Sequence, residues 1–348
     1  MQAGAPQDRH ARTRQALARA AVIDVHAHVV LEETMGAAGA MGPVLGAPDD
    51  GPPWFSVGDY RLDGVRYKGS PFMDAGVRLQ RLDAAGIDVQ VLSPNPLTFL
   101  HFIDAGDAIN FCRIHNDALA ERVAAHSTRL CALAALPAQD PVAAVEELTR
   151  AVTDLGFLGG YMGTNTPRPL EDKAFDPLYQ AFVDLNVPLF LHPAPAGIDG
   201  PKGDPNLTDY DLDVVIGFAA QEAIAVARLI YGEVLDRFPA LDICLSHGGG
   251  STAYLLGRMA AAARKRPWSP QALRADGAFE ERFAKLWLDT HLNSDASLDL
   301  LVSIVGRERL VFGTNFAGWD APDDLSGHRP PQDLADNARR LLRVTSTP

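Results

Sequence analysis

Short apolar runs rich in β-branched residues recur along the chain, and stretches with helical spacing lie between several of them. One such stretch is 141–155, where apolar residues follow one another at intervals of three or four positions. Short apolar runs alternating with helical patterns are typical of buried parallel strands and the helices that connect them. The runs predicted to be strands are Ala21–Val25, Val89–Ser93, Leu130–Leu136, Gly156–Met162, Val187–Leu191, Leu241–Ser246, Lys285–Thr290 and Leu310–Thr314.

Eight strand and helix units favour one particular α/β architecture. A parallel sheet of eight strands closes readily into a (β/α)₈ barrel of the TIM type. The chain has 348 residues, which such a barrel can hold in one domain, and we find no linker with a shift in composition. We therefore predict a single barrel domain over residues 1–348.

Two long connections interrupt the regular pattern. Residues 29–77, after the first predicted strand, are rich in glycine and proline, and residues 194–212 form a similar loop after the fifth strand. A long irregular stretch in a compact domain is usually functional. Both follow the carboxyl ends of strands, where barrels build their active sites. We predict that residues 29–77 are an insertion that acts as a lid.

Composition narrows the classes of partner. The net charge is −13 at neutral pH, which argues against nucleic acid and anionic membranes as partners. No apolar run approaches the ~20 residues of a membrane span, so we expect no membrane contact. The three cysteines show no CxxC spacing, which predicts reduced thiols in a cytoplasmic protein.

Two histidines follow the first predicted strand. His26 and His28 alternate after the apolar stretch 22–25, and residues two apart in a strand share a face. At the carboxyl end of a barrel strand, that face points into the mouth. Two imidazoles in this position can bind one zinc or manganese ion.

Further histidines stand at equivalent positions. His192 ends the fifth predicted strand and His247 ends the sixth. His291 follows Asp289 after the seventh, so it is a candidate for the mouth lining. Strand ends converge in a barrel, and several imidazoles in a small volume repel one another when protonated, unless a metal organises them. The sequence therefore predicts a metal site at the mouth.

These motifs resemble those of a known family. The chain is similar to the amidohydrolase superfamily, in the branch of aminocarboxymuconate-semialdehyde decarboxylase and related metal-dependent decarboxylases. The resemblance runs from about Val22 to about Phe316. The stretches that carry it are Ile23-Asp24-Val25-His26-Ala27-His28, residues 78–90, Leu191-His192-Pro193, and His247-Gly248-Gly249-Gly250 with Gly257-Arg258.

The resemblance implies roles for particular residues. His26, His28 and His192 would bind one metal together with an aspartate after the eighth strand, and His247 would hold or deprotonate a metal-bound water. Two arginines would clamp a substrate carboxylate. Arg66 lies in the insertion, and Arg258 follows His247 by eleven residues. In the family the latter arginine serves the neighbouring subunit, which implies a homodimer.

The chain departs from the family on the eighth strand. The family reads Gly-Thr/Ser-Asp and an aromatic residue, whereas this chain reads Gly313-Thr314-Asn315-Phe316. Asn315 can bind a cation through its oxygen, but it has no charge and takes no proton. Either a water or a nearby carboxylate such as Asp320 substitutes, or the reaction needs no base there, or the sequence is an impaired engineered variant.

The resemblance also implies the reaction. It predicts non-oxidative decarboxylation of a small unsaturated or aromatic carboxylic acid, with one divalent metal ion as cofactor, zinc before manganese. His247 and Asn315 are the candidate catalytic residues, and Phe316 is a candidate contact for a planar substrate. The alternatives are a metal-dependent hydrolase of C–C, C–N or ester bonds or a hydratase on the same scaffold, and a non-catalytic metal- or ligand-binding barrel.

Overall fold

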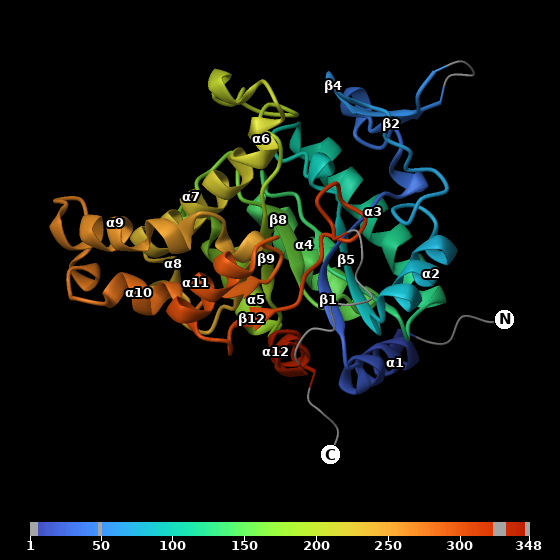
Figure 1. Cartoon of the computed structure of the whole chain (residues 1–348). Coiled ribbons are helices and arrows are strands. Elements are labelled where there is room, and N and C mark those ends of the chain that lie inside the picture. The colour runs from blue at the N-terminus through green and yellow to red at the C-terminus, as the bar shows by residue number, and fades with distance from the viewer. Residues whose placement is uncertain (1–5, 48–50, 323–331, 345–348) are drawn as a thin grey trace.

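Parallel strands form a barrel at the centre of the molecule (Figure 1). The computed structural model describes residues 6–47, 51–322 and 332–344. Each predicted run contains a strand, although the third run divides around Leu133 and the fourth strand begins four residues later than predicted. The barrel strands are β1 (Ile23–Val29), β5 (Val89–Pro94), β6 (Leu130–Ala132) with β7 (Ala134–Ala135), β8 (Gly160–Gly163), β9 (Leu189–His192), β10 (Ile243–Leu245), β11 (Trp287–Asp289) and β12 (Leu310–Val311).

Backbone hydrogen bonds close this sheet into a cylinder. One set of parallel strands has the order β1-β5-β6 and the other β12-β11-β10-β9-β8-β7. The amide of Val25 donates to the carbonyl of Phe312 at 2.9 Å, which joins β1 to the end of β12, and the amide of Leu133 donates to Leu92 at 2.9 Å. The predicted (β/α)₈ barrel is therefore confirmed.

Helices cover the outside of the barrel. The helices after the barrel strands are α2 (Ala75–Ala85), α3 (Ala105–Ala125), α4 (Pro141–Arg150), α5 (Asp176–Asp184), α6 (Leu212–Val215), α7 (Gly217–Tyr231), α8 (Val234–Arg237), α9 (Thr252–Lys265), α10 (Ala278–Phe283), α11 (Asp295–Val305) and α12 (Gln332–Leu341). Four of them, α2, α3, α4 and α11, begin at an acidic or hydroxyl side chain that accepts a hydrogen bond from the first turn, as Asp140 does from the amides of Val142 and Ala143. The predicted helix over 141–155 ends in a π-turn, and its Val142 is exposed rather than buried.

Two hydrophobic clusters stabilise the barrel. One lies between the strands and the surrounding helices. The other fills the barrel interior and continues into α1 (Pro6–Arg19) and α12, which lie together at one end of the molecule (Figure 1). Arg339 ties these two helices together, since its Nη1 donates to the carbonyls of Leu17 and Ala20. The segment before β1 is thus a helix that closes the amino-terminal end of the barrel.

A β-bulge in β1 determines which way its histidines point. Ile23 pairs with Val89 and Ala27 with Leu92, so β1 has one more residue than β5 in this interval. Ile23 and Val25 pack inside the barrel, whereas Ala27 packs outside it. The extra residue reverses the alternation after Val25. It therefore turns the side chain of His26 from the outer face of the strand to the inner one.

Residues 30–74 connect β1 to α2. They contain a small antiparallel sheet of β2 (Val44–Gly46), β3 (Trp54–Val57) and β4 (Tyr60–Asp63), which lies at the opposite end of the molecule from α1 and α12 (Figure 1). Phe55 and Tyr67 pack with Phe111 of α3 and Ile198 of the loop after β9 in a third cluster. The segment is thus anchored to the rim, and its lid role stays a prediction.

One helical stretch is apolar and long enough to span a membrane, contrary to the expectation from the sequence. Helices α6 and α7 together cover Leu212–Tyr231, which by length and composition alone is long and apolar enough, and 39% of its most apolar window is buried. Glu222 and Val226 of this stretch are fully buried in the protein. A core helix of a globular domain passes the same test, so this is weak evidence for a membrane span.

Candidate metal centre and active site

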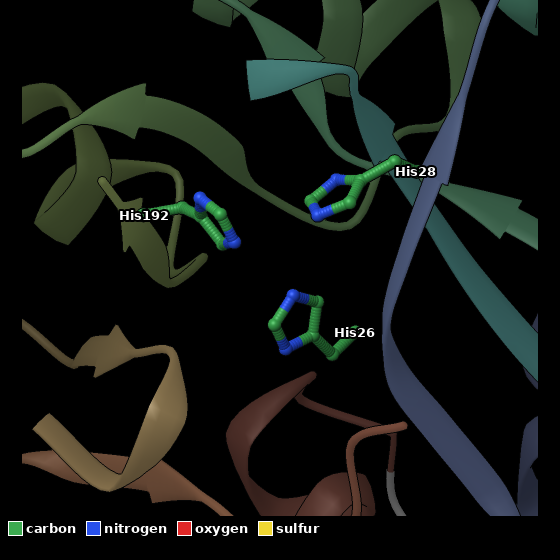
Figure 2. Close-up of side chains that lie close together, drawn as sticks. All are labelled: His26, His28 and His192. Carbon is green, nitrogen blue, oxygen red and sulfur yellow. The ribbon is translucent and has the colours of Figure 1, made fainter. Parts of the chain in front are cut away.

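Three predicted histidines meet at the carboxyl ends of β1 and β9 (Figure 2). One ligand atom from each of His26, His28 and His192 lies within 4.8 Å of the others. The ring centroids are 5.1 Å apart for His26 and His28, and 4.8 Å apart for His28 and His192. Side chains from strands distant in sequence thus form one compact, buried group.

Each of the three rings uses its Nδ1 atom for a hydrogen bond behind the site. Nδ1 of His26 lies 2.7 Å from Oδ2 of Asp289, and Nδ1 of His192 lies 2.6 Å from the Pro193 carbonyl. Nδ1 of His28 lies near Ser93 Oγ and the Pro94 carbonyl. The three Nε2 atoms are buried without hydrogen-bond partners among the described residues. Such outer partners fix the tautomer that presents Nε2 to a metal, so the three side chains fit a divalent ion.

Burial keeps these imidazoles neutral. It lowers the pKa of His26 and lowers the pKa of His28 and of His192 well below the ordinary range, and the neighbouring imidazoles add to the effect. Asp289 opposes this shift at His26 without reversing it. A metal ligand must be deprotonated at the coordinating nitrogen. The environment therefore favours the protonation state that metal binding requires.

His247 lies beside this group in a different electrostatic environment. Its ring centroid is 4.9 Å from that of His192, and its Nδ1 lies 2.9 Å from Oε1 of Glu222, a fully buried residue of α7. Burial alone would lower the pKa of His247, but the carboxylates of Glu222, Asp289 and Asp320 together outweigh it, Glu222 most strongly, and raise the pKa to about 9. Among the clustered histidines, His247 is thus suited to carry a proton.

A buried polar network holds the two strand ends behind the histidines. The Asp24 carboxylate accepts hydrogen bonds from the amides of His26 and Thr314 and from the side chains of Thr314 and Gln90. Arg78 completes the network, since it donates to Gln90 Oε1 and to the carbonyl of His28. Asp24 on β1 and Thr314, which follows β12, are therefore linked by hydrogen bonds behind the histidines.

Asn315 contacts a carboxylate instead of presenting one. Its Nδ2 donates to Oδ1 of Asp320 at 2.6 Å, and Oδ2 of Asp320 lies 3.0 Å from Nε2 of His291. One ligand atom from each of His247, His291 and Asp320 lies within 4.8 Å of the others. The nearby carboxylate considered from the sequence thus lies with His291 and His247, whereas the metal-ligand role of Asn315 stays a prediction.

The other predicted substrate contacts lie in different surroundings. Arg66, in the coil after β4, and Arg258, on α9, are both exposed, and neither forms an ion pair with a residue in the described ranges. Phe316 is 3% exposed, packs in the outer core, and has the guanidinium of Arg78 5.4 Å from its ring centre. No substrate is present, so all three roles stay predictions.

Two residues of the site were not singled out from the sequence. Asp289 positions His26, and Glu222 positions His247. Each carries a recognisable signal, because Asp289 ends a predicted buried strand and Glu222 is an acidic residue within an apolar helical stretch. A buried carboxylate needs a partner, and here each carboxylate has a site histidine.

A barrel with neutral histidines converging at its mouth defines a class, the metal-dependent α/β-barrel enzymes. Comparison with known proteins identifies the family: the chain belongs to the amidohydrolase family, whose model matches residues 23–344. Within it, the chain falls in the branch of aminocarboxymuconate-semialdehyde and γ-resorcylate decarboxylases. The predicted family is therefore confirmed.

Two similar sequences illustrate this branch, and one similar structure illustrates the fold. The chain is 29% identical over 244 residues to 2-amino-3-carboxymuconate-6-semialdehyde decarboxylase of Dictyostelium discoideum, covering 70% of this chain and 66% of that one. It is 32% identical over 289 residues to γ-resorcylate decarboxylase of Rhizobium sp., covering 77% and 86%. Dihydroxybenzoic acid decarboxylase of Polaromonas sp., solved with manganese and 2-nitroresorcinol, is 24% identical with a TM-score of 0.70, covering 93% and 97%.

Proposed function

We propose that this protein is a metal-dependent carboxy-lyase that removes CO₂ without oxidation from a small aromatic or unsaturated carboxylic acid. The observation that carries the proposal is the arrangement of the histidines. Three Nε2 atoms converge without partners, and beside them stands His247, the imidazole that Glu222 favours in its charged form. A cation site next to a proton donor meets both needs of decarboxylation, charge stabilisation and protonation of carbon.

His26, His28 and His192 would hold the ion. When bound, a divalent metal supplies a Lewis acid that polarises a substrate oxygen. Three imidazole nitrogens suit zinc, and they also suit manganese when oxygen donors complete the coordination. The Polaromonas relative was solved with manganese. We therefore propose zinc or manganese as the resident ion, with zinc the first expectation from the nitrogen donors.

His247 would supply the proton. Its imidazolium donates a proton to the substrate carbon that bears the carboxylate, the bond between that carbon and the carboxylate breaks, and CO₂ leaves. The products are CO₂ and the substrate carbon bearing hydrogen, with His247 left neutral. Glu222 would position the ring through Nδ1 and stabilise its charged form. Nε2 is then the nitrogen that faces the substrate.

Orientation of the substrate carboxylate falls to the predicted arginines. Arg66 and Arg258 are exposed guanidinium groups, and a planar guanidinium can hold a carboxylate through two parallel hydrogen bonds. Phe316, predicted as a contact for a planar ring, is 3% exposed and packs in the outer core, so it would act on such a ring only through the residues that it packs against. We also propose that Arg258 contacts the substrate bound in a neighbouring subunit, so that the protein acts as a homodimer. A cytoplasmic location belongs to the same proposal.

The direct test is CO₂ release. Metal-free protein is reloaded with zinc or manganese and incubated with a panel of 2-hydroxybenzoates and carboxymuconate semialdehydes. In D₂O, product from an active pair carries deuterium at the carbon that lost the carboxylate. His247→Gln should lower kcat by roughly 10²–10⁴ because the proton donor is gone, whereas His126→Gln, at the end of α3, serves as the histidine control.

Two results would contradict the proposal. Hydrolysis or hydration products without CO₂ from this panel would assign the site to the alternative reactions on the same scaffold. Failure of the purified protein to take up any transition metal would remove the basis for metal-dependent catalysis of either kind.

A further inference from the structure

A small cavity lies at the rim of the barrel, bounded by the loops that follow β5 and β9. Its volume is about 20 Å³, and His101 is one of the residues that line it. We propose that this cavity is a subsite for a ring hydroxyl of the substrate, which accepts a hydrogen bond from Nδ1 of His101. The proposal rests on the proposed function, because it narrows the class of substrate at the same site.

The cavity adjoins a strand end that carries a candidate metal ligand. Gly163 ends β8 and pairs with His192 of β9, and neighbouring strands lie about 4.8 Å apart. The amide of Gly163 donates to Nε2 of His101 at 2.9 Å. Ala194, two residues after His192, lines the cavity. The ring of His101 is therefore separated from the end of β9 only by the end of β8.

Packing holds the ring of His101 in one orientation. The ring is 2% exposed and stacks on Phe99, with centroids 5.3 Å apart and planes inclined by 11°. A Cβ atom at Gly163 would lie 3.1 Å from a ring carbon of each of these side chains, which is closer than such contacts normally are. The glycine thus leaves the space in which the two rings pack, and His101 presents a fixed edge to its surroundings.

The free edge of this ring is a hydrogen-bond donor. Burial lowers the pKa of His101 to about 3, so the ring is neutral and carries one hydrogen. Because Nε2 accepts from Gly163, that hydrogen is on Nδ1. Nδ1 is buried, and it has no hydrogen-bond partner among the described residues. A buried donor without an acceptor destabilises the protein, so an oxygen atom of a ligand would be bound favourably here.

The size of the cavity limits what can enter it. A cavity needs roughly 10–15 Å³ in this measure to hold one water molecule. The volume of about 20 Å³ therefore admits a substituent of about one oxygen atom rather than a second ring. Leu97, Phe99 and Ile198 contribute apolar walls and are each less than 10% exposed. A substituent on an otherwise apolar ring fits these surroundings.

The charge around the cavity selects a neutral oxygen. Asp199 lines the cavity, and its Oδ2 accepts a hydrogen bond from the amide of Phe102. Among the described residues, those that line the cavity include no lysine or arginine. A second carboxylate on the ligand would therefore be repelled by Asp199 without compensation. A hydroxyl is suitable because it is uncharged and can accept from His101.

The test measures whether the protein recognises an additional hydroxyl. Zinc- or manganese-loaded protein is titrated calorimetrically with 2-hydroxybenzoate and with its 2,3-, 2,4-, 2,5- and 2,6-dihydroxy analogues. We expect the wild-type protein to bind one of the dihydroxy isomers roughly tenfold more tightly than 2-hydroxybenzoate, because only a hydroxyl at the right position reaches Nδ1. Binding is measured directly, so the result does not depend on turnover.

Two substitutions separate recognition from a structural role of His101. His101→Gln keeps an acceptor for the Gly163 amide but has no donor in place of Nδ1, so it should lose the preference while still binding 2-hydroxybenzoate. His101→Asn places an amide donor near the position of Nδ1 and should keep part of the preference. His115→Gln changes another buried histidine, outside the site, and should keep all of it. Melting temperatures establish that each variant is folded.

The outcomes distinguish this proposal from the proposed reaction. The same preference in wild type and His101→Gln, or no preference in wild type, would overturn the subsite and would mean that Nδ1 is satisfied by water alone. CO₂ release without a hydroxyl preference would overturn only the subsite, and a preference without CO₂ release would overturn only the reaction. Failure of the loaded protein to bind any member of the panel would overturn both.

Discussion

The Nδ1 atom of His26, on the first barrel strand, lies 2.7 Å from Oδ2 of Asp289, at the end of the seventh. The contact joins residues 263 positions apart and places a buried anion directly behind a candidate metal ligand. A carboxylate in this position fixes the ring and makes its other nitrogen a stronger donor. Asp289 is therefore a positioning residue for the metal centre.

Removing that charge should weaken metal binding. Asp289→Asn keeps an acceptor for the Nδ1 hydrogen of His26 but loses the anion, and changes of this kind lower metal affinity by roughly 10–100-fold. The affinity is measured by Mn²⁺ titration of metal-free protein. Asp242→Asn is a matched control, because Asp242 pairs with Arg343 away from the histidine cluster. Equal affinities for Asp289→Asn and wild type would show that Asp289 does not tune the site.

A carboxylate at position 315 should make the metal-free protein less stable. Asn315→Asp puts two carboxylates side by side, since Nδ2 of Asn315 now lies 2.6 Å from Oδ1 of Asp320. Like charges at this distance destabilise each other unless a proton or cation intervenes. We expect a lower melting temperature without metal and a larger increase on addition of Mn²⁺, both measured by calorimetry.

A double variant controls for the change of side chain. Asn315→Asp combined with Asp320→Asn exchanges the two groups and keeps one charge and one amide. Its melting temperature without metal should return toward that of the wild type. If Asn315→Asp without metal is as stable as the wild type, then a carboxylate at position 315 does not repel Asp320, and the prediction is wrong.

The sequence predicted the barrel and much of the site for a common physical reason. Strands of a parallel barrel all end at one mouth, so histidines that end separate strands, such as His28 and His192, must lie near each other. Their residue types and positions are local features of the sequence. The orientation of His26 is not, because the β-bulge that turns it inward depends on pairing between β1 and β5.

The partners of the histidines could not be predicted in the same way. Glu222 lies on α7 and reaches His247 only because the helix packs against that side of the barrel. Phe316 follows a strand-end motif in sequence, but the bridge between Ala27 and Phe316 continues the barrel and places its ring in the core. Both outcomes depend on tertiary packing rather than on periodicity.

The buried Arg78 should be essential for the stability of the barrel. It is 2% exposed and donates to the carbonyls of Pro71 and His28 and to Gln90. Arg78→Met keeps much of the side-chain volume but leaves these acceptors unpaired, and breaking a buried charged network costs about 3–5 kcal/mol. Urea unfolding measures the change in the free energy of unfolding.

Arg81→Met provides the matched control on the same helix. Arg81 is exposed and has no ion pair within the described portion of the chain, so its substitution should change stability by less than about 0.5 kcal/mol. A similar small effect for Arg78→Met would mean that the network around Asp24 does not hold the strand ends together.

Two buried histidines outside the metal centre should make the protein sensitive to acid. Burial lowers the pKa of His101 to about 3 and that of His115 to about 4. Nε2 of His101 accepts a hydrogen bond from the amide of Gly163, which requires the neutral ring. The unfolded chain binds these protons near pH 6.5 and the folded chain does not. The stability that the two neutral rings contribute is therefore fully present above pH 6.5, and it is lost as the pH falls toward their pKa values in the folded protein.

The part of this loss of stability that is due to His115 can be measured by comparing the wild type with a variant that lacks this histidine. Between pH 8 and pH 5, His115 should account for roughly 2 kcal/mol of lost stability, since each pKa unit corresponds to about 1.4 kcal/mol. Urea unfolding of metal-free wild type and His115→Leu at several pH values measures this, and the variant's curve should be flatter by that amount. His126→Gln, with a partly exposed ring, should follow the wild-type slope. Parallel curves for wild type and His115→Leu would show that His115 is not held neutral by the fold.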